Sequence, residues 1–222
     1  MTDLPARPDF EAIDAVAAST ADSRTRVLAL IGNLVFAWSN NESMFVHVLQ
    51  ILLEGDEVTA ALVFGTLNTT RARLELIERL AAAKLQEGEA ERALHAAIDE
   101  FGALTRIRNE FNHCTYGINA RGEIAQTYAM RITETKGKLR LGTARAMDEA
   151  RLQEMTDAVA RLKKLNRDLW DLLPVLKAAV EATAAIRARA ARRASRPALA
   201  RDLEPAATTR RAPASSAVDG DR

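Results

Sequence analysis

A cluster of polar side chains closes a helical pattern near the middle of the chain. Arg108 and Asn112 lie on or beside the apolar side of this helix, and His113 follows directly. An unpaired arginine is costly to bury, so Arg108 needs an anionic partner or a water-filled cleft. Histidine transfers protons near neutral pH and arginine binds two phosphate oxygens, a pairing that suits acid–base chemistry at a phosphate group. The apolar positions of the helix recur at three- and four-residue intervals; they are Leu94, Ile98, Phe101, Leu104, Ile107 and Phe111.

The segment Arg108-Asn109-Glu110-Phe111-Asn112-His113 resembles the Arg-polar-x(3 to 5)-His signature of the HEPN superfamily. This superfamily consists of small all-helical domains, and many members are metal-independent endoribonucleases of toxin–antitoxin, anti-phage and CRISPR-linked systems. The polar residue after the arginine, the position at a helix end and the loop-forming Tyr116-Gly117 strengthen the match. Arg106 and His113 form a second arginine–histidine match of this kind. The resemblance extends over about residues 22 to 173.

The resemblance implies a role for each residue of the motif. His113 would act as general acid or base, Arg108 would stabilise the charge on the phosphate, and Asn109 would orient the reacting groups. Members of the family generally dimerise so that two motifs face one cleft, which implies a homodimer with a composite site. Single-stranded RNA is then the expected substrate, no metal or other cofactor is expected, and the product would carry a 2′,3′-cyclic phosphate. DNA lacks the 2′-hydroxyl and should survive.

Helix geometry limits how this pair could act. Five residues on an ideal helix separate Arg108 and His113 by about 140°. The two side chains converge only if the helix ends before His113, or if they meet across a dimer. Otherwise, His113 is a helix-terminal histidine favoured by the helix dipole, and Arg108 is held in an ion pair with Glu42 or Glu110. The protein would then be a catalytically inactive helical module for interaction or nucleotide binding.

A second polar interruption lies in the long helical pattern of residues 22 to 54. Its apolar stripe predicts an inward position at residue 41 or 42, which hold Asn41 and Glu42. We expect a buried polar site there, with Asn41, Glu42 and Asn112 supporting the motif and Glu42 as the counter-charge of Arg108. A break at Ser39-Asn40-Asn41, with Asn41 capping a second helix, is the alternative.

Composition sets the class of protein. The 222 residues are 48% hydrophobic and 27% charged, which is typical of a folded domain of ordinary size with an added tail. A net charge of +1 gives no general attraction to nucleic acid or membrane. The single Cys114 excludes an internal disulfide framework and fits a reducing compartment. We expect a cytoplasmic protein without a signal peptide or membrane span, whose partners are a second copy, RNA and an antitoxin or other defence-system protein.

The remaining patterns predict an all-α, up-and-down helical bundle of the HEPN type with a small β-hairpin inserted before the last long helix. Residues 1–21 form a lead-in with a short helix, residues 22–194 form the bundle, and residues 195–222 form a disordered basic tail. Shorter helices are expected at about 58–67, 71–85 and 89–113, and the hairpin at about 122–143. The last helix begins after Asp148 and should kink or restart at Pro174.

Four arginines near the carboxyl end recur at helical intervals and could follow a phosphate backbone. They are Arg189, Arg192, Arg193 and Arg196. A solvated tail is the competing interpretation.

Overall fold

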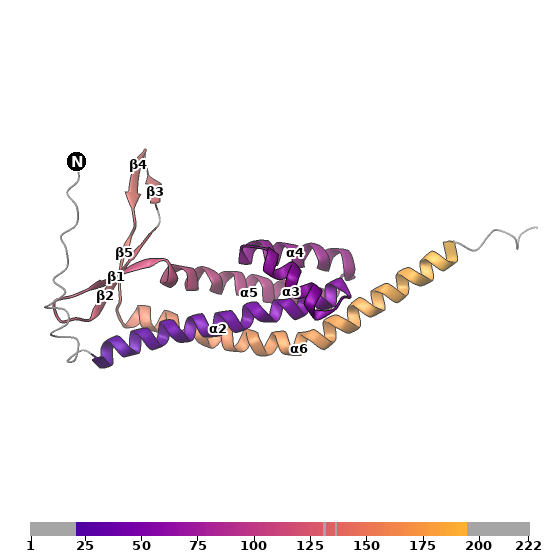
Figure 1. The fold of residues 1–222 in the computed structure, drawn as a ribbon, viewed down its shortest axis with the longest axis horizontal. Coiled ribbons are helices and arrows are strands. Elements are labelled where there is room, and N and C mark those ends of the chain that lie inside the picture. Colours follow the sequence, from indigo (N-terminus) through magenta and orange to yellow (C-terminus); the bar gives the residue numbers. More distant parts are fainter. Residues whose placement is uncertain (1–20, 131, 136, 195–222) are drawn as a thin grey trace, which may run out of the picture. The chain divides into compact units, whose positions relative to one another are not determined.

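The computed structural model describes residues 21–130, 132–135 and 137–194 (Figure 1). Helices make up most of this part of the chain, and short antiparallel strands lie between the last two of them. The helices are α2 (Ala21–Leu53), α3 (Glu57–Thr66), α4 (Thr70–Lys84), α5 (Glu89–Asn112) and α6 (Glu149–Ala194). The predicted helical character is therefore confirmed. The chain divides into two compact units, Met1–Ala184 and Ala185–Arg222, and the features below belong to the first unit unless stated.

Capping side chains set several of the helix starts. Asp56 accepts a hydrogen bond of 2.9 Å from the amide of Thr59 at the start of α3. Thr69 accepts one of 3.1 Å from Ala72 at the start of α4. Asp148 accepts one of 2.9 Å from the amide of Arg151 at the start of α6, as the sequence predicts. Such caps satisfy amides that have no partner within the helix.

Two predicted interruptions are absent. Helix α2 runs without a break through Ser39-Asn40-Asn41, so the alternative of two helices is wrong. Helix α6 likewise continues through Pro174, so a restart is wrong, and the alternative of a kink stays a prediction. A proline removes one helical hydrogen bond, and the apolar stripe of α6 continues into the core on both sides of it, at Leu172 and Leu176.

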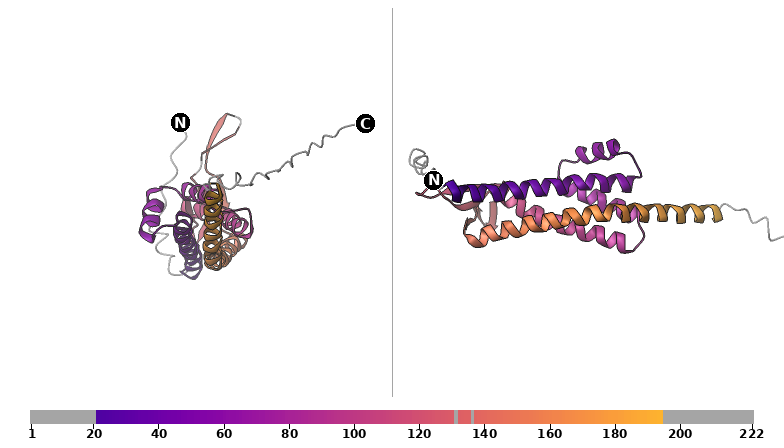
Figure 2. Two further views of the ribbon diagram at one scale, coloured as in Figure 1. Left: turned by 90° about the vertical axis from the view of Figure 1, so that its right-hand side faces the viewer. Right: turned by 90° about the horizontal axis from the view of Figure 1, so that it is seen from below.

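One hydrophobic core joins the helices of the first unit. Helix α2 and the first part of α6 lie side by side in two views and run in the same direction, whereas α5 runs the opposite way (Figures 1 and 2). At the centre, the rings of Trp38 and Phe101 are stacked with centroids 5.5 Å apart, and Phe45 lies 5.1 Å from Phe101. Fully burying a large apolar side chain contributes about 1.5–3 kcal/mol. This core fixes α5 against α2.

Strands form at the end of α5. Strands β1 (Cys114–Ile118), β2 (Ile124–Ala129) and β5 (Ala144–Ala146) make an antiparallel sheet in the order β1-β2-β5. Strands β3 (Ile132–Thr135) and β4 (Lys138–Leu141) make a separate pair, with Gly137 at a positive φ of 72° in the turn. The sheet lies at the end of the bundle where α2 and α6 begin (Figure 1).

The predicted hairpin at 122–143 is thus confirmed only in part. The first half of the predicted hairpin is divided between two strands, because β2 pairs with β1 and β5 while Ile132 begins β3. Strands β1 and β5 were not predicted. The short helix expected near Ile13 and the tail from residue 195, with Arg196, lie outside the described residues.

Candidate functional site

The motif helix ends one residue before the motif histidine. His113 is the C-cap of α5, with φ −119° and ψ 44°, and its amide donates a 3.0 Å hydrogen bond to the carbonyl of Asn109. Strand β1 begins at the next residue, Cys114, and the carbonyl of His113 accepts a 3.3 Å bond from the amide of Met130. The side chain of His113 is exposed. The helix therefore ends before His113, but this ending does not bring Arg108 and His113 together within one chain.

A groove of about 710 Å³ opens beside this histidine. Its helical wall carries Arg106, Asn109 and His113, three and four residues apart and hence on one face of α5. The strands and their connections supply the opposite wall. The remaining lining residues are Glu110, Ala129, Met130, Thr143 and Arg145. The groove thus combines the imidazole of His113, the amide of Asn109 and the guanidinium of Arg106, which suit binding and protonation of a phosphate ester. Its carboxylate, Glu110, is paired with Arg145 and Arg151.

Arg108 lies on a different side of α5, against α2. Its guanidinium carbon is 3.8 Å from the centre of the Trp38 ring, and the indole Nε1 of Trp38 donates a 2.9 Å bond to Thr105 Oγ1. The Nη1 atom of Arg108 donates a 2.7 Å bond to Asn109 Oδ1, while its buried Nε has no hydrogen-bond partner among the described residues. Burial lowers the pKa of Arg108, and the more distant charge of Glu42 partly offsets this effect.

Asn109 therefore lies between the packing of Arg108 against α2 and the groove beside His113. It is bonded to the half-buried Arg108 and at the same time lines the groove that contains His113. Within one chain, Arg108 does not line the groove; Arg106, from the second arginine–histidine match, lines it in its place. Seven residues complete almost two helical turns, which brings Arg106 to the face of His113.

The predicted pairing of Glu42 with Arg108 needs correction. The carboxylate of Glu42 lies 3.0 Å from Nη1 of Arg73 and accepts a 2.7 Å bond from Thr70 Oγ1. Both partners belong to α4, whose start packs against the middle of α2. Glu42 therefore joins α2 to α4 and acts on Arg108 only through space.

The other supporting residues also have different roles from those predicted. Asn41 is buried, as expected, and its Nδ2 donates bonds of 2.8 and 2.9 Å to the carbonyls of Ala37 and Leu162. It joins α2 to α6 and does not contact the motif. Asn112 is exposed at the last position of α5 rather than buried beside the apolar stripe.

A second arginine centre, which the sequence did not reveal, lies behind the groove. Arg151 is 3% exposed, and its guanidinium carbon is 4.2 Å from the centre of the Phe111 ring. Its Nη2 lies 2.6 Å from the carboxylate of Glu110, and its Nη1 binds Glu154. Arg145 contacts the same two carboxylates at 2.6 and 3.4 Å. This network joins α5, β5 and α6 and so holds the walls of the groove together.

The strand that follows the motif is fastened to the same place. Tyr116 Oη donates a 2.7 Å bond to the carbonyl of Phe111, and Cys114 Sγ donates a 3.3 Å bond to it. Burial raises the pKa of both the phenol and the thiol. Neither group is therefore ionised at neutral pH, which argues against Cys114 as a nucleophile.

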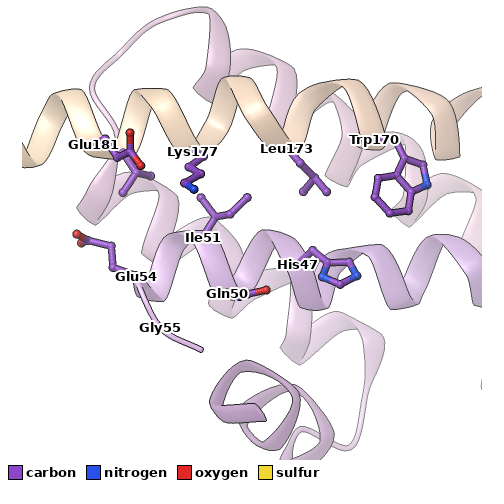
Figure 3. Close-up of a pocket in the computed structure, with 10 residues that line it drawn as sticks. His47, Gln50, Ile51, Glu54, Gly55, Trp170, Leu173, Lys177 and Glu181 are labelled. Carbon is purple, nitrogen blue, oxygen red and sulfur yellow. The ribbon is translucent and has the colours of Figure 1, made fainter. Parts of the chain in front are cut away.

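A further pocket of about 480 Å³ lies between α2 and α6 (Figure 3). His47 faces Trp170 across it with ring centroids 6.2 Å apart, and Lys177 lies on the same wall as Trp170. Glu54 and Glu181 lie toward its other end. This pocket is separate from the groove beside His113.

Comparison of the chain with models of protein families, with curated proteins and with solved structures gives no match. In the described ranges, no three His, Cys, Asp or Glu residues are grouped so that they could hold a metal ion. No described helix is long and apolar enough to cross a membrane. In the second unit, Arg189, Arg192 and Arg193 are exposed on α6.

Proposed function

We propose that the protein is a metal-independent endoribonuclease of the HEPN type that cleaves single-stranded RNA in the groove beside His113. The observation that carries this proposal is the position of Asn109, which is bonded to Arg108 and shares the groove with Arg106 and His113. The resemblance of the motif to the HEPN signature supports the same activity. A toxin or anti-phage defence effector is the biological role that fits such an enzyme.

The residues divide the chemistry as follows. His113 is the general acid or base, since its exposed side chain lines the groove and an imidazole can both accept and donate a proton. Arg106 binds the phosphate and faces the charge that develops on it. Arg108 acts through Asn109: its guanidinium holds the amide oxygen and so directs the amide group toward the groove. Arg108 is therefore a positioning residue.

A second copy of the chain completes the site. Transfer of the 2′-hydroxyl proton and protonation of the leaving 5′-oxygen need two groups, and one histidine in one chain supplies only one. A homodimer that brings two grooves together would provide His113 twice. The product would be a 2′,3′-cyclic phosphate, and DNA would remain intact.

The decisive experiment incubates the purified protein with labelled single-stranded RNA in EDTA. We expect His113→Ala to lower the cleavage rate by about 10²- to 10⁴-fold, and Arg106→Ala to lower it as well. His95→Ala is the matched control, because His95 is a partly exposed histidine on the same helix, away from the groove. Its cleavage rate should equal that of the unchanged protein.

The dimer is tested by mixing. Since the composite site needs His113 from both chains, adding an excess of His113→Ala protein to the unchanged protein should lower its cleavage rate, because each mixed dimer retains only one His113. A monomer in light scattering at micromolar concentration would contradict the composite site. Expression of the unchanged protein, but not of His113→Ala, should slow the growth of host cells if the protein is a toxin.

The second candidate is a catalytically inactive helical module. The stacking of Arg108 on Trp38 favours it, because that arrangement also serves packing alone. Equal cleavage by the unchanged and His113→Ala proteins would point to a contaminant. Absence of cleavage in all variants, by proteins that form the dimer, would favour the module.

A further inference from the structure

The pocket of about 480 Å³ between α2 and α6, which we call the Trp170 pocket, has a size and a position typical of small-molecule sites in helical proteins (Figure 3). Three kinds of side chain follow one another along it. His47 and Trp170 form one end, Ile51 and Leu173 line the middle, and charged side chains form the other end. This order matches a ligand with a ring at one end and charged groups at the other.

The aromatic end of the Trp170 pocket offers a flat surface. The ring centroids of His47 and Trp170 are 6.2 Å apart, with an angle of 34° between the planes. Carbon atoms in contact lie about 3.5–4 Å apart, so a third ring does not fit between these two. Trp170 is nevertheless 55% exposed, which leaves much of its indole free. A ligand ring therefore lies against Trp170, with Leu173 beside it.

The charged end of the pocket contains one cation and one anion that are available to a ligand. In the part of the chain that the structure describes, the side chains of Lys177 and Glu181 have no ion-pair or hydrogen-bond partner. They lie four residues apart on α6, which places their Cβ atoms about 6 Å apart. The ammonium and carboxylate groups of an α-amino acid are bonded to the same carbon atom, so one molecule presents both groups to this pair.

Glu54, at the same end of the pocket, occupies a position that is unfavourable for it. It follows the last residue of α2 with a positive φ of 53°, a conformation that favours glycine. A negative charge at the C-terminal end of a helix is also unfavourable, and the exposed ion pair with Lys84 offsets little of this. Residues held in such conformations cluster at ligand sites. Glu54 adds negative charge near Glu181, where an ammonium group would lie.

We infer that the Trp170 pocket binds a free α-amino acid with an aromatic side chain. The ring lies against Trp170, the carboxylate contacts Lys177, and the ammonium contacts Glu181. Seven residues of α6 separate Trp170 from Lys177, which is about 10 Å along the helix axis. The side chain of a helical lysine points back toward the N-terminus of its helix and so shortens this span. The site shares no lining residue with the groove beside His113 and is independent of the proposed nuclease activity.

The test measures binding of L-phenylalanine and two analogues to the full-length protein by isothermal titration calorimetry. 2-Phenylethylamine lacks the carboxylate, and 3-phenylpropionate lacks the ammonium group. We expect phenylalanine to bind with a Kd of about 1 mM or below, and each analogue to bind about tenfold more weakly. Absence of phenylalanine binding at concentrations well above this value would overturn the inference. Equal binding of phenylalanine and 2-phenylethylamine would overturn it too.

Variants assign each charged group of the ligand to its partner. Lys177→Met should weaken phenylalanine binding about tenfold but leave the binding of 2-phenylethylamine unchanged. Glu181→Gln should weaken phenylalanine binding to a similar extent but leave the binding of 3-phenylpropionate unchanged. Trp170→Ala should weaken the binding of all three compounds. Lys163→Met is the matched control, because Lys163 is an exposed lysine of α6 outside the pocket, and it should bind phenylalanine as the unchanged protein does.

The replaced side chains are exposed, so the variants should keep the fold, and urea unfolding checks this. An equal loss of phenylalanine and 2-phenylethylamine binding in Lys177→Met would show that this lysine does not hold the carboxylate, which would overturn the inference. Phenylalanine binding that is unchanged in both Lys177→Met and Glu181→Gln would place the ligand elsewhere and would also overturn it.

Discussion

Two arginines, Arg108 on α5 and Arg151 at the start of α6, each lie over an aromatic ring, but they differ in the charged groups that surround them. Arg151 lies over Phe111 and is matched by the carboxylates of Glu110 and Glu154. Arg108 lies over Trp38, and its Nη1 donates a hydrogen bond to the neutral amide of Asn109. The buried charge of Arg151 is paired with carboxylates and so can stabilise the fold. The half-buried charge of Arg108 has a neutral hydrogen-bond partner, which lowers stability and indicates that Arg108 has a role other than stabilising the fold.

The largest effect on stability should come from Arg151. Replacing it by methionine, as Arg151→Met, leaves Glu110 and Glu154 with Arg145 as their only cation from this network. Breaking a buried ion pair from one side costs about 3 kcal/mol. We expect the free energy of unfolding, measured with urea, to fall by that amount. A smaller loss than in the equivalent Arg108 variant would remove the distinction between the two arginines.

Arg108→Met should have the opposite profile to Arg151→Met, with a small effect on stability and a large effect on RNA cleavage. Because no carboxylate is left behind as a close unpaired partner, the free energy of unfolding should change by less than about 1 kcal/mol. RNA cleavage should nevertheless fall about 30-fold, since Asn109 loses the group that orients it, and that loss equals about 2 kcal/mol of transition-state stabilisation. The measurements are urea unfolding and cleavage under saturating RNA. Unchanged cleavage would show that Arg108 serves packing alone.

Trp38→Phe tests the ring beneath Arg108. The change removes the indole bond to Thr105 and weakens the contact with the guanidinium. Together these losses should lower the free energy of unfolding by about 1.5 kcal/mol. Trp170→Phe is the control, because this exposed tryptophan should change stability by less than about 0.5 kcal/mol. Similar losses in the two variants would mean that the contact with Arg108 contributes nothing.

Tyr116→Phe tests the hydrogen bonding at Phe111, the ring beneath Arg151, and should change the free energy of unfolding least among these variants. At neutral pH it removes the hydroxyl bond to the carbonyl of Phe111, which costs about 1 kcal/mol. Burial raises the pKa of Tyr116, so the fold favours the neutral phenol. This contribution is complete below the unfolded pKa of about 10 and is lost as the pH rises through the higher folded value.

The unchanged protein should therefore lose stability more steeply than Tyr116→Phe as the pH rises above about 10, because Tyr116→Phe has no phenol to ionise at this position. Urea midpoints across this range provide the measurement. Parallel curves for the two proteins would show that Tyr116 is not the group that responds to alkali.

Long periodic stripes made most of the helical architecture predictable. The apolar positions of α5 and α6 repeat over many turns, and Asp148 caps α6 where a capping residue was expected. Strands β1 and β5 escaped prediction for a physical reason. Strand β5 has only three residues, and β1 follows α5 with no turn residue between them, so neither shows enough alternation to be recognised.

The sequence predicted the elements that carry the candidate site but not the contacts of its residues. The approximate end of α5 and the burial of Asn41 follow from spacing along single helices. The partner of Glu42 and the burial of Arg151 depend on which helix packs against which, information that one sequence does not contain. The HEPN relationship, the nuclease activity and the dimer stay predictions.

The absence of a linker after α5 has a consequence for how the chain tolerates change. Only His113 lies between α5 and β1. Successive side chains turn by about 100° along the helix and by about 180° along the strand. One extra residue inserted there would turn every side chain of β1 to the opposite face, bringing Tyr116 out to solvent and Thr115 under the sheet. The length of this junction should therefore resist insertion and deletion more strongly than the turn at Gly137 between β3 and β4.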